Sequence, residues 1–290
     1  MPSNTQPKIV VIGEGGYLGE RIREHFGPDT IITMDDITNL EVIGASVAAW
    51  QPDIVINAAA LTNTNEIEKP ENRAAAYAVN VQGPANLAYL ARKHGFYLVH
   101  LSTGMMFDGA GPEGDGWKET DLPIPASYYA WTKAFADAQL LPFSTDPGTL
   151  ILRLHMPLSR RSHPRNMLQK FQQFAKGTDG QQTMTIVEDL IESLDALVRQ
   201  RTTGVYHVVN PGTISVFEIL TLLQKHGLIA ADVQLEEVSQ ADYNKGVAEK
   251  GGAYQSTPIL NTKKLQEAGI HLKDIHQAIE DCIQELKKVS

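Results

Sequence analysis

The sequence predicts an α/β fold, in which a doubly wound parallel sheet is joined to a smaller C-terminal lobe. The first observation is a set of continuous apolar runs, which are typical of strands buried on both faces. The second is that helical patterns separate the early runs, and strand followed by helix, repeated, predicts parallel pairing. The strand-like runs cover residues 8–13, 30–34, 53–59, 96–102, 149–154 and 204–210.

The predicted helices place apolar residues three and four positions apart. They cover residues 16–27, 71–95, 127–141, 164–177 and 215–227. The last of them opens with Ser215 and has Glu218 three residues later, which is the spacing of a capping box, and it closes at Gly227.

The regular alternation of strand and helix loosens after residue 155. We therefore predict a first domain over residues 1–155, to which part of 186–215 is added. The rest, mainly 156–290, is predicted to form the second lobe.

The composition excludes several classes of partner. The chain has 290 residues, of which 42% are hydrophobic and 20% charged, as in an ordinary globular protein. A formal net charge of −9 argues against a nucleic-acid or anionic-membrane partner, because either would need clustered Lys and Arg. No apolar run approaches the ~20 residues of a membrane span, and the N-terminus does not resemble a signal peptide. We expect a cytoplasmic protein.

Cysteine and histidine usage argues against disulfides and metal. The single cysteine, Cys282, lies among apolar residues at helical spacing, which predicts a small buried group. One cysteine allows no disulfide within the chain. The nine histidines show no paired spacing of the kind that holds zinc, so we expect no metal site.

A glycine loop, GEGGYLG over residues 13–19, follows the first predicted strand and opens the first predicted helix. Gly13 permits a tight turn, Gly16 lets backbone amides approach a pyrophosphate, and Gly19 lets helix and strand pack closely. An ordinary glycine turn is the alternative. The context favours a dinucleotide site that includes Gly15, Tyr17 and Leu18.

Two acidic residues, Asp35 and Asp36, follow the second predicted strand, about 20 residues after the glycine loop. A carboxylate there accepts hydrogen bonds from the adenosine ribose and repels a 2′-phosphate. Glu14 adds to that repulsion, and no Arg or Lys lies nearby at the strand end. NADH is therefore favoured over NADPH. The alternative is that either aspartate only shapes a turn.

Tyr129 and Lys133 form a candidate proton-transfer pair. Their four-residue spacing puts both on one face of the predicted helix. A neighbouring ammonium stabilises the phenolate of a tyrosine, whose ordinary pKa is ~10. Tyr128 has Thr132 at the same spacing, so it is rejected as the acid. The alternative is that Tyr129 and Lys133 are ordinary surface or half-buried helix residues.

These motifs occur in the order glycine loop, Asn57 to Ala60, Ser102 with Thr103, and Tyr129 with Lys133, and together they resemble the extended short-chain dehydrogenase/reductase superfamily. Within it, residues 36–63, 79–103 and 107–109 resemble dTDP-4-dehydrorhamnose reductase. Residues 102–107, 152–171, 183–190 and 203–215 are more similar to the plant-type UDP-4-keto-6-deoxyglucose 3,5-epimerase/4-reductase.

The resemblance implies a Rossmann-like domain that holds NAD(P)H and a second lobe that holds a nucleoside-diphosphate sugar. In that family Thr103 would polarise the 4-keto oxygen, Tyr129 would deliver the proton, and Lys133 would hold the cofactor ribose. The resemblance also places Ala58, Ala59, Ala60 and Asn80 along the cofactor cleft, and Arg165 and Asn166 within reach of the sugar diphosphate. Met105 and Met106 are candidates for the lining of the substrate pocket, because methionine packs adaptably against ligand surfaces. Packing is the alternative role for the methionines, and it is favoured for Met106.

Two positions depart from the family pattern. Gly104 stands where bacterial rhamnose reductases have aspartate, and Met105 stands where the bifunctional members have a cysteine paired with a lysine that matches Lys170. A 3,5-epimerase needs two groups that gain and lose protons. Met105 does neither, so we expect no epimerase activity and a solvated Lys170.

The leading hypothesis is an NAD(P)H-dependent enzyme that reduces the 4-keto group of an NDP-4-keto-6-deoxy sugar, as a homodimer. One alternative is a bifunctional 3,5-epimerase/4-reductase that makes NDP-rhamnose. Another is a cofactor-binding regulatory subunit without catalysis. Thr103, Tyr129 and Lys133 together argue for catalysis, because a binding module needs the glycines but not the acid.

Overall fold

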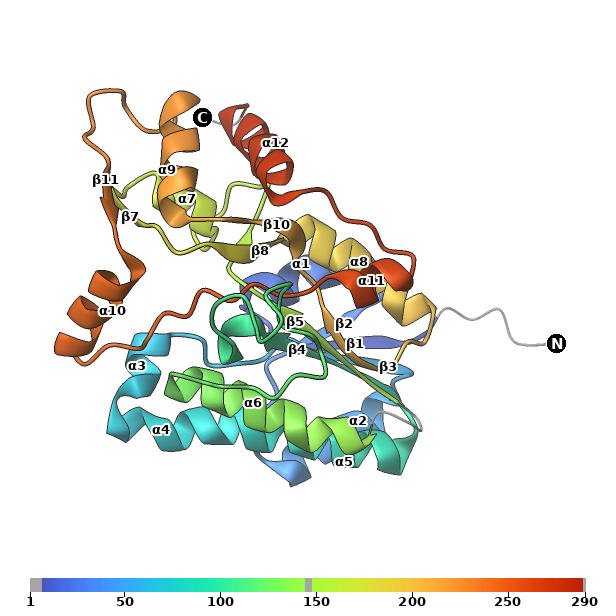
Figure 1. Cartoon of the computed structure of the whole chain (residues 1–290). Helices are drawn as coiled ribbons and strands as arrows, with labels where there is room; N and C mark the ends of the chain where they lie inside the picture. Colours follow the sequence, from blue (N-terminus) through green and yellow to red (C-terminus); the bar gives the residue numbers. More distant parts are fainter. Residues whose placement is uncertain (1–6, 144–147, 289–290) are drawn as a thin grey trace.

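A computed structural model describes residues 7–143 and 148–288. At its centre lies a six-stranded sheet whose order is β2-β1-β3-β4-β5-β9, with every pair parallel (Figure 1). From β1 the chain builds outward first to one edge and then to the other, as expected of a doubly wound sheet. The strands are β1 Ile9–Ile12, β2 Ile31–Thr33, β3 Ile54–Asn57, β4 Tyr97–Thr103, β5 Thr149–Leu154 and β9 Gly204–His207.

Helices cover both faces of this sheet, which explains why its strands are apolar without alternation. Val11 belongs to the core shared with Ile22 of α1 and Leu190 of α8, whereas its neighbour Val10 belongs to the core shared with Leu87 of α5. One face is covered by α1 Tyr17–Phe26, α8 Val187–Arg199 and α11 Lys263–Glu267. The other is covered by α2 Leu40–Trp50, α5 Gly83–His94 and α6 Tyr128–Leu140 (Figure 1).

The helix predicted over 71–95 is interrupted by a π-helical segment. The structure divides it into α4 Pro70–Tyr77, the π segment Ala78–Gln82, and α5. A short helix, α3 Thr64–Glu68, precedes it. Such widened turns often occur at functional sites, and here the segment carries Asn80.

The second lobe is built on two small sheets. One has the order β10-β8-β6, and in the other β11 pairs with β7. Its helices α9 and α12 cover an apolar core that includes the buried Cys282, whose thiol pKa is raised by burial. The elements are β6 Pro157–Leu158, α7 Met167–Phe171, β7 Lys176–Thr178, β8 Gln182–Ile186, β10 Asn210–Ile214, α9 Val216–Lys225, β11 Glu236–Val238, α10 Gln240–Glu249 and α12 Ile275–Lys287.

Two predicted elements of the second half are corrected. The helix expected over 164–177 is only the five residues of α7, because the chain then enters β7, where Gly177 lies against the backbone of Phe217. A Cβ at position 177 would stand 2.6 Å from the Cα of Phe217, so this close approach needs glycine. The strand expected over 204–210 ends at His207, and Asn210 begins β10 of the other sheet. The capping box of Ser215 and Glu218 is confirmed.

No helix among the described residues is both long and apolar enough to cross a membrane.

The close packing between β1 and α1 can be tested by a substitution in the glycine loop. A Cβ at Gly19 would lie 2.4 Å from the carbonyl oxygen of Gly13, so Gly19→Ala should lower the free energy of unfolding by about 1–3 kcal/mol. Gly44→Ala is the matched control, because its Cβ would meet only Leu90 Cδ2 at 3.6 Å inside α2. Urea unfolding should show the control unchanged or more stable by about 0.4–1 kcal/mol. Equal stability of the two variants would contradict this packing.

Candidate active site

The glycine loop leaves backbone amides free to bind an anion. Helix α1 begins at Tyr17, and its N-cap residue Gly16 supplies no side chain to satisfy the first amides. Gly15 has a φ of +73°, and a Cβ placed on it would meet no atom within 4 Å, so space lies open beside the loop. An open helix N-terminus with glycine backbone fits the pyrophosphate of a nicotinamide dinucleotide.

The two aspartates lie where β2 ends, beside this loop. Gly13 and Glu14 both donate backbone hydrogen bonds to the carbonyl of Thr33, the last residue of β2. Asp35 accepts a hydrogen bond from Ser46. Asp36 is exposed, and hydrogen bonds from the side chain and backbone of Thr38 lower the pKa of its carboxyl.

The alanines after β3 form the wall opposite the loop. The backbone of Ala58 comes within 2.9 Å of where a Cβ of Gly13 would stand. Asn80 supports this wall rather than facing open space, because its amide group pairs with both the N–H and the C=O of Leu61, at 2.8 and 3.0 Å, and donates to Thr132 at 3.2 Å. Asn80 therefore fixes the chain that follows Ala60.

Thr103, Tyr129 and Lys133 are brought together at the end of β4. All three are buried, and Ser127 caps α6 through the amide of Ala130, which fixes the turn that carries Tyr129. Burial raises the pKa of the Tyr129 phenol to about 12, and the nearby Thr103 hydroxyl offsets part of that rise. Burial also lowers the pKa of the Lys133 ammonium to about 8.

The Nζ atom of Lys133 is hydrogen-bonded to groups of β4 rather than to Tyr129. This atom lies 2.8 Å from the carbonyl of Leu101 and 3.0 Å from Nε2 of His100. The ring of His100 in turn lies 3.1 Å from the amide of Asn57 on β3. Asn57 was named from the sequence only as part of a family motif, with no role, and His100 was missed, although a histidine inside an apolar strand was the available signal.

A second buried network continues along α6. Asp137 stands one turn after Lys133 and accepts hydrogen bonds from Ser102 at 2.6 Å and from Arg153 at 2.8 Å. Its carboxylate and the Arg153 guanidinium are almost fully buried. A buried ion pair needs this full satisfaction, so α6 is fixed on the sheet at one register. The spacing of 129, 133 and 137 was the sequence signal.

The two methionines after Thr103 have different surroundings. Met105 is partly exposed and packs on the cluster that contains Tyr129, Ile67 and Ala76, so it lies beside the proposed acid. Met106 is fully buried with Phe107 and other aromatic and aliphatic side chains. The structure thus places Met105 at the site and Met106 in the core.

The loop over 159–166 crosses from the second lobe to the glycine loop. Arg165 donates a hydrogen bond to the carbonyl of Gly15, and the rings of His163 and Tyr17 stack with centroids 4.4 Å apart. Asn166 is buried and caps α7, with its amide used by Ser159, Arg161 and Leu168 backbone groups. Arg165 therefore lies nearer the predicted cofactor loop than the sequence suggested, and Asn166 has a structural role.

Lys170 is exposed at the end of α7, as expected of a solvated lysine.

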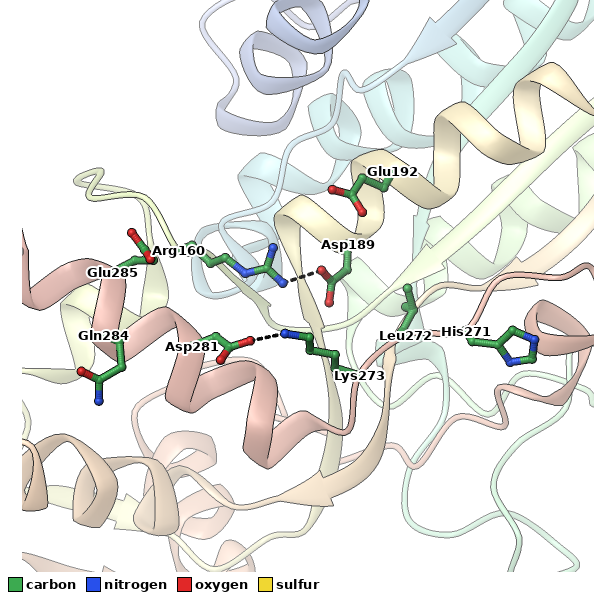
Figure 2. Close-up of a pocket in the computed structure, with 9 residues that line it drawn as sticks. All are labelled: Arg160, Asp189, Glu192, His271, Leu272, Lys273, Asp281, Gln284 and Glu285. Carbon is green, nitrogen blue, oxygen red and sulfur yellow. Dashed lines mark hydrogen bonds and ion pairs between the residues drawn. The ribbon is translucent and has the colours of Figure 1, made fainter.

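A charged groove of about 480 Å³ between α8 and α12 has none of Thr103, Tyr129 and Lys133 among its lining residues (Figure 2). The Arg and Lys side chains that line it already form salt bridges, Arg160 with Asp189 at 2.7 Å and Lys273 with Asp281 at 2.6 Å. Carboxylates also outnumber cations among its lining residues, so it does not attract a diphosphate. No group of three or more potential metal ligands gathers within residues 7–143 and 148–288.

Comparison with known proteins agrees with this geometry. A bifunctional dTDP-4-dehydrorhamnose 3,5-epimerase/reductase of Arabidopsis thaliana is 28% identical over 234 residues, which is 77% of each chain. The crystal structure of the L780 UDP-rhamnose synthase of Acanthamoeba polyphaga mimivirus superposes with a TM-score of 0.87 at 24% identity, covering 97% of this chain and all of the other.

A dTDP-4-dehydrorhamnose reductase of Bacillus anthracis, solved in complex with NADP, superposes with a TM-score of 0.81 at 23% identity, again covering 97% of this chain and all of the other. The family model described as the RmlD substrate binding domain matches residues 7–288. The chain therefore belongs to the RmlD substrate-binding-domain family.

Proposed function

We propose that this protein is an NAD(P)H-dependent reductase of the 4-keto group of an NDP-4-keto-6-deoxy sugar. The observation that carries the proposal is the meeting of Thr103, Tyr129 and Lys133 at the carboxyl end of β4. Because the sheet is parallel, this end lies at the same edge as the glycine loop after β1. The relatives named above support the same reaction class.

The residues divide the chemistry as follows. Thr103 is placed to hydrogen-bond the 4-keto oxygen, and Tyr129 is placed to give that oxygen its proton. The raised pKa of Tyr129 keeps the phenol protonated at neutral pH, which is the state an acid needs for reduction. A bound NAD(P)H would supply the hydride. Lys133 would hold its ribose, and the loop amides would hold its pyrophosphate.

We also infer a preference for NADH over NADPH. Three carboxylates, those of Glu14, Asp35 and Asp36, lie near the end of β2, and no salt bridge to them is found among the described residues. A 2′-phosphate placed there would be repelled by these carboxylates. Solved structures of similar fold hold either cofactor, NADP in the Bacillus anthracis reductase and NAD in the Thermus thermophilus UDP-glucose 4-epimerase.

The proposed reaction does not include 3,5-epimerisation. Met105 packs beside Tyr129 with a thioether that neither takes nor gives a proton, and Lys170 is exposed on α7. Epimerisation needs two groups that exchange protons, and positions 105 and 170 do not supply such a pair. The bifunctional alternative would have to use residues other than this pair.

A regulatory role without catalysis accounts for the glycine loop but not for the burial of Tyr129 and Lys133 beside Thr103. Burying a lysine lowers stability unless the group is well paired and hydrogen-bonded, so its retention beside Thr103 and Tyr129 favours a catalytic role over cofactor binding alone. Binding of the sugar nucleotide near Met105 and Arg165, the homodimer and the cytoplasmic location stay predictions.

The assignment of the acid is tested with Tyr129→Phe. We expect NADH oxidation by an NDP-4-keto-6-deoxy sugar to fall by roughly 10²–10⁴-fold, because the proton donor is lost. NADH binding, followed by fluorescence, should be retained. Tyr128→Phe is the matched control and should keep its activity, since the Tyr128 hydroxyl contacts only the carbonyl of Arg73 at 3.4 Å. Unchanged turnover in Tyr129→Phe would exclude Tyr129 as the acid.

The absence of epimerase activity is tested by solvent exchange. The keto sugar is incubated with the protein in D₂O without cofactor, and deuterium at C3 and C5 is measured by NMR and mass spectrometry. We expect no enzyme-dependent incorporation, while the bifunctional Arabidopsis relative serves as the positive control. Deuterium at either carbon would show that another residue pair performs the exchange.

The cofactor preference is tested by binding. NADH should bind roughly tenfold more tightly than NADPH, as expected for one repelled phosphate. Asp36→Ala should narrow that ratio. Asp29→Ala removes the same charge from an exposed residue before β2, so it should leave the ratio unchanged. Tighter binding of NADPH by the native chain would refute the preference.

A further inference from the structure

The side chains of Asn57, His100 and Lys133 form a buried chain of hydrogen bonds that links β3, β4 and α6. Asn57 and His100 are paired in register across the two strands, so their side chains lie on the same face of the sheet. Lys133 reaches this pair from above, on α6. All three are at most 1% exposed, so water does not supply alternative partners.

The donors and acceptors of these three side chains fit together in only one arrangement of protons. The Oδ1 atom of Asn57 accepts from the backbone N–H of Ala59 at 3.1 Å, so its amide NH₂ must face His100. The Nδ1 atom of His100 is then an acceptor without a proton. A neutral imidazole carries its proton on the other nitrogen, Nε2, which lies 3.0 Å from Lys133 Nζ.

An Nε2–H donor needs an acceptor, and only the neutral amine of lysine has a free electron pair. The amine can still donate to the carbonyl of Leu101 at 2.8 Å. The ammonium would instead place two donors against each other, either at His100 Nε2 or, after a tautomer change, between His100 Nδ1 and Asn57. An unsatisfied buried donor costs about 1–3 kcal/mol.

We propose that His100 is a positioning residue, and that with Asn57 it forms a relay that favours the neutral amine of Lys133 over its ammonium. Asn57 determines that the proton of His100 lies on Nε2. The Nε2–H group then needs an acceptor, which the neutral amine of Lys133 supplies and its ammonium does not.

The other charged groups around Lys133 do not compensate the ammonium. Asp137, one turn along α6, favours it, but the two oxygens of that carboxylate are occupied by Ser102 and by Arg153 of β5. Tyr129, one turn before, keeps its proton. Burial disfavours charge on both members of the pair, which lowers the pKa of Lys133 to about 8 and that of His100 well below its ordinary value.

The consequence for catalysis rests on the proposed function. If Lys133 changes charge near neutral pH, the stabilisation of the Tyr129 phenolate weakens as the pH rises through that value. Tyr129 then stays in its protonated form, which is the form that reduction of a ketone needs, whereas the reverse oxidation needs the phenolate as a base.

The first test is the tautomer of His100, measured by ¹⁵N NMR on the full-length protein without ligand, at a pH above the Lys133 midpoint, where Lys133 is the neutral amine. The signal is assigned by its loss in His100→Gln. We expect the proton on Nε2, and a proton on Nδ1 or on both nitrogens would overturn the relay. Neither substrate nor cofactor is needed, so this result is independent of whether the proposed reaction is correct.

The second test is the titration of Lys133, followed through its Cε signal and assigned by its loss in Lys133→Arg. We expect a midpoint at or below about 8, against ~10.4 for an ordinary lysine. A midpoint near the ordinary value would overturn the proposal.

Asn57→Asp should move the proton of His100 to Nδ1 and so favour the ammonium of Lys133. A carboxylate accepts from Ala59 N–H and also from His100 Nδ1–H, which leaves Nε2 as an acceptor for the ammonium. The Lys133 midpoint should rise by about one unit or more. In a His100→Phe background the same substitution should have a much smaller effect, and an undiminished rise would show that the added charge acts directly. If Asn57→Asp does not fold, the His100 tautomer and the Lys133 midpoint measured on the native protein still test the proposal.

Discussion

The constraint on which the site depends is that Lys133 and Asp137, buried between α6 and the sheet, must find polar partners. Tyr129, Lys133 and Asp137 lie four residues apart, so they form one row along the face of the helix that meets the sheet. Strands β4 and β5 supply the hydrogen-bond partners: His100 lies beside Lys133, while Ser102 and Arg153 donate to Asp137. Any other register of α6 would leave a charge unpaired in the core, so the helix and its acid have one position.

The parallel sheet then brings the remaining parts to the same edge. Gly13 follows β1, Asp35 follows β2, Ala58 follows β3 and Thr103 ends β4. Carboxyl ends of parallel strands share one edge, so residues far apart in sequence meet there without any long excursion of the chain. The close approach of Gly13 to Ala58 shows how little space separates these turns. The loop of Arg165 adds a contact from the second lobe.

Local patterns were sufficient where a segment is stabilised mainly by its own composition. The six sheet strands, the glycine loop and the Tyr129 helix were predicted because apolar runs and helical spacing reflect burial directly. The second lobe was predicted less well. Its strands are three to five residues long apart from the two-residue β6, and their pairing partners are distant in sequence, as for Lys176 and Glu236 of β7 and β11. Such short segments carry little periodicity of their own.

The sequence by itself determined the parallel α/β core, the order of the motifs, and the presence of a tyrosine, lysine and threonine suited to carbonyl reduction. Only the tertiary structure decided which of these residues have partners. Asn57 and His100 meet because β3 and β4 pair in register, and Met105 and Met106, adjacent in the chain, lie in different surroundings. The physical reason is that hydrogen bonding and burial in the core depend on contacts between segments, which no single segment encodes.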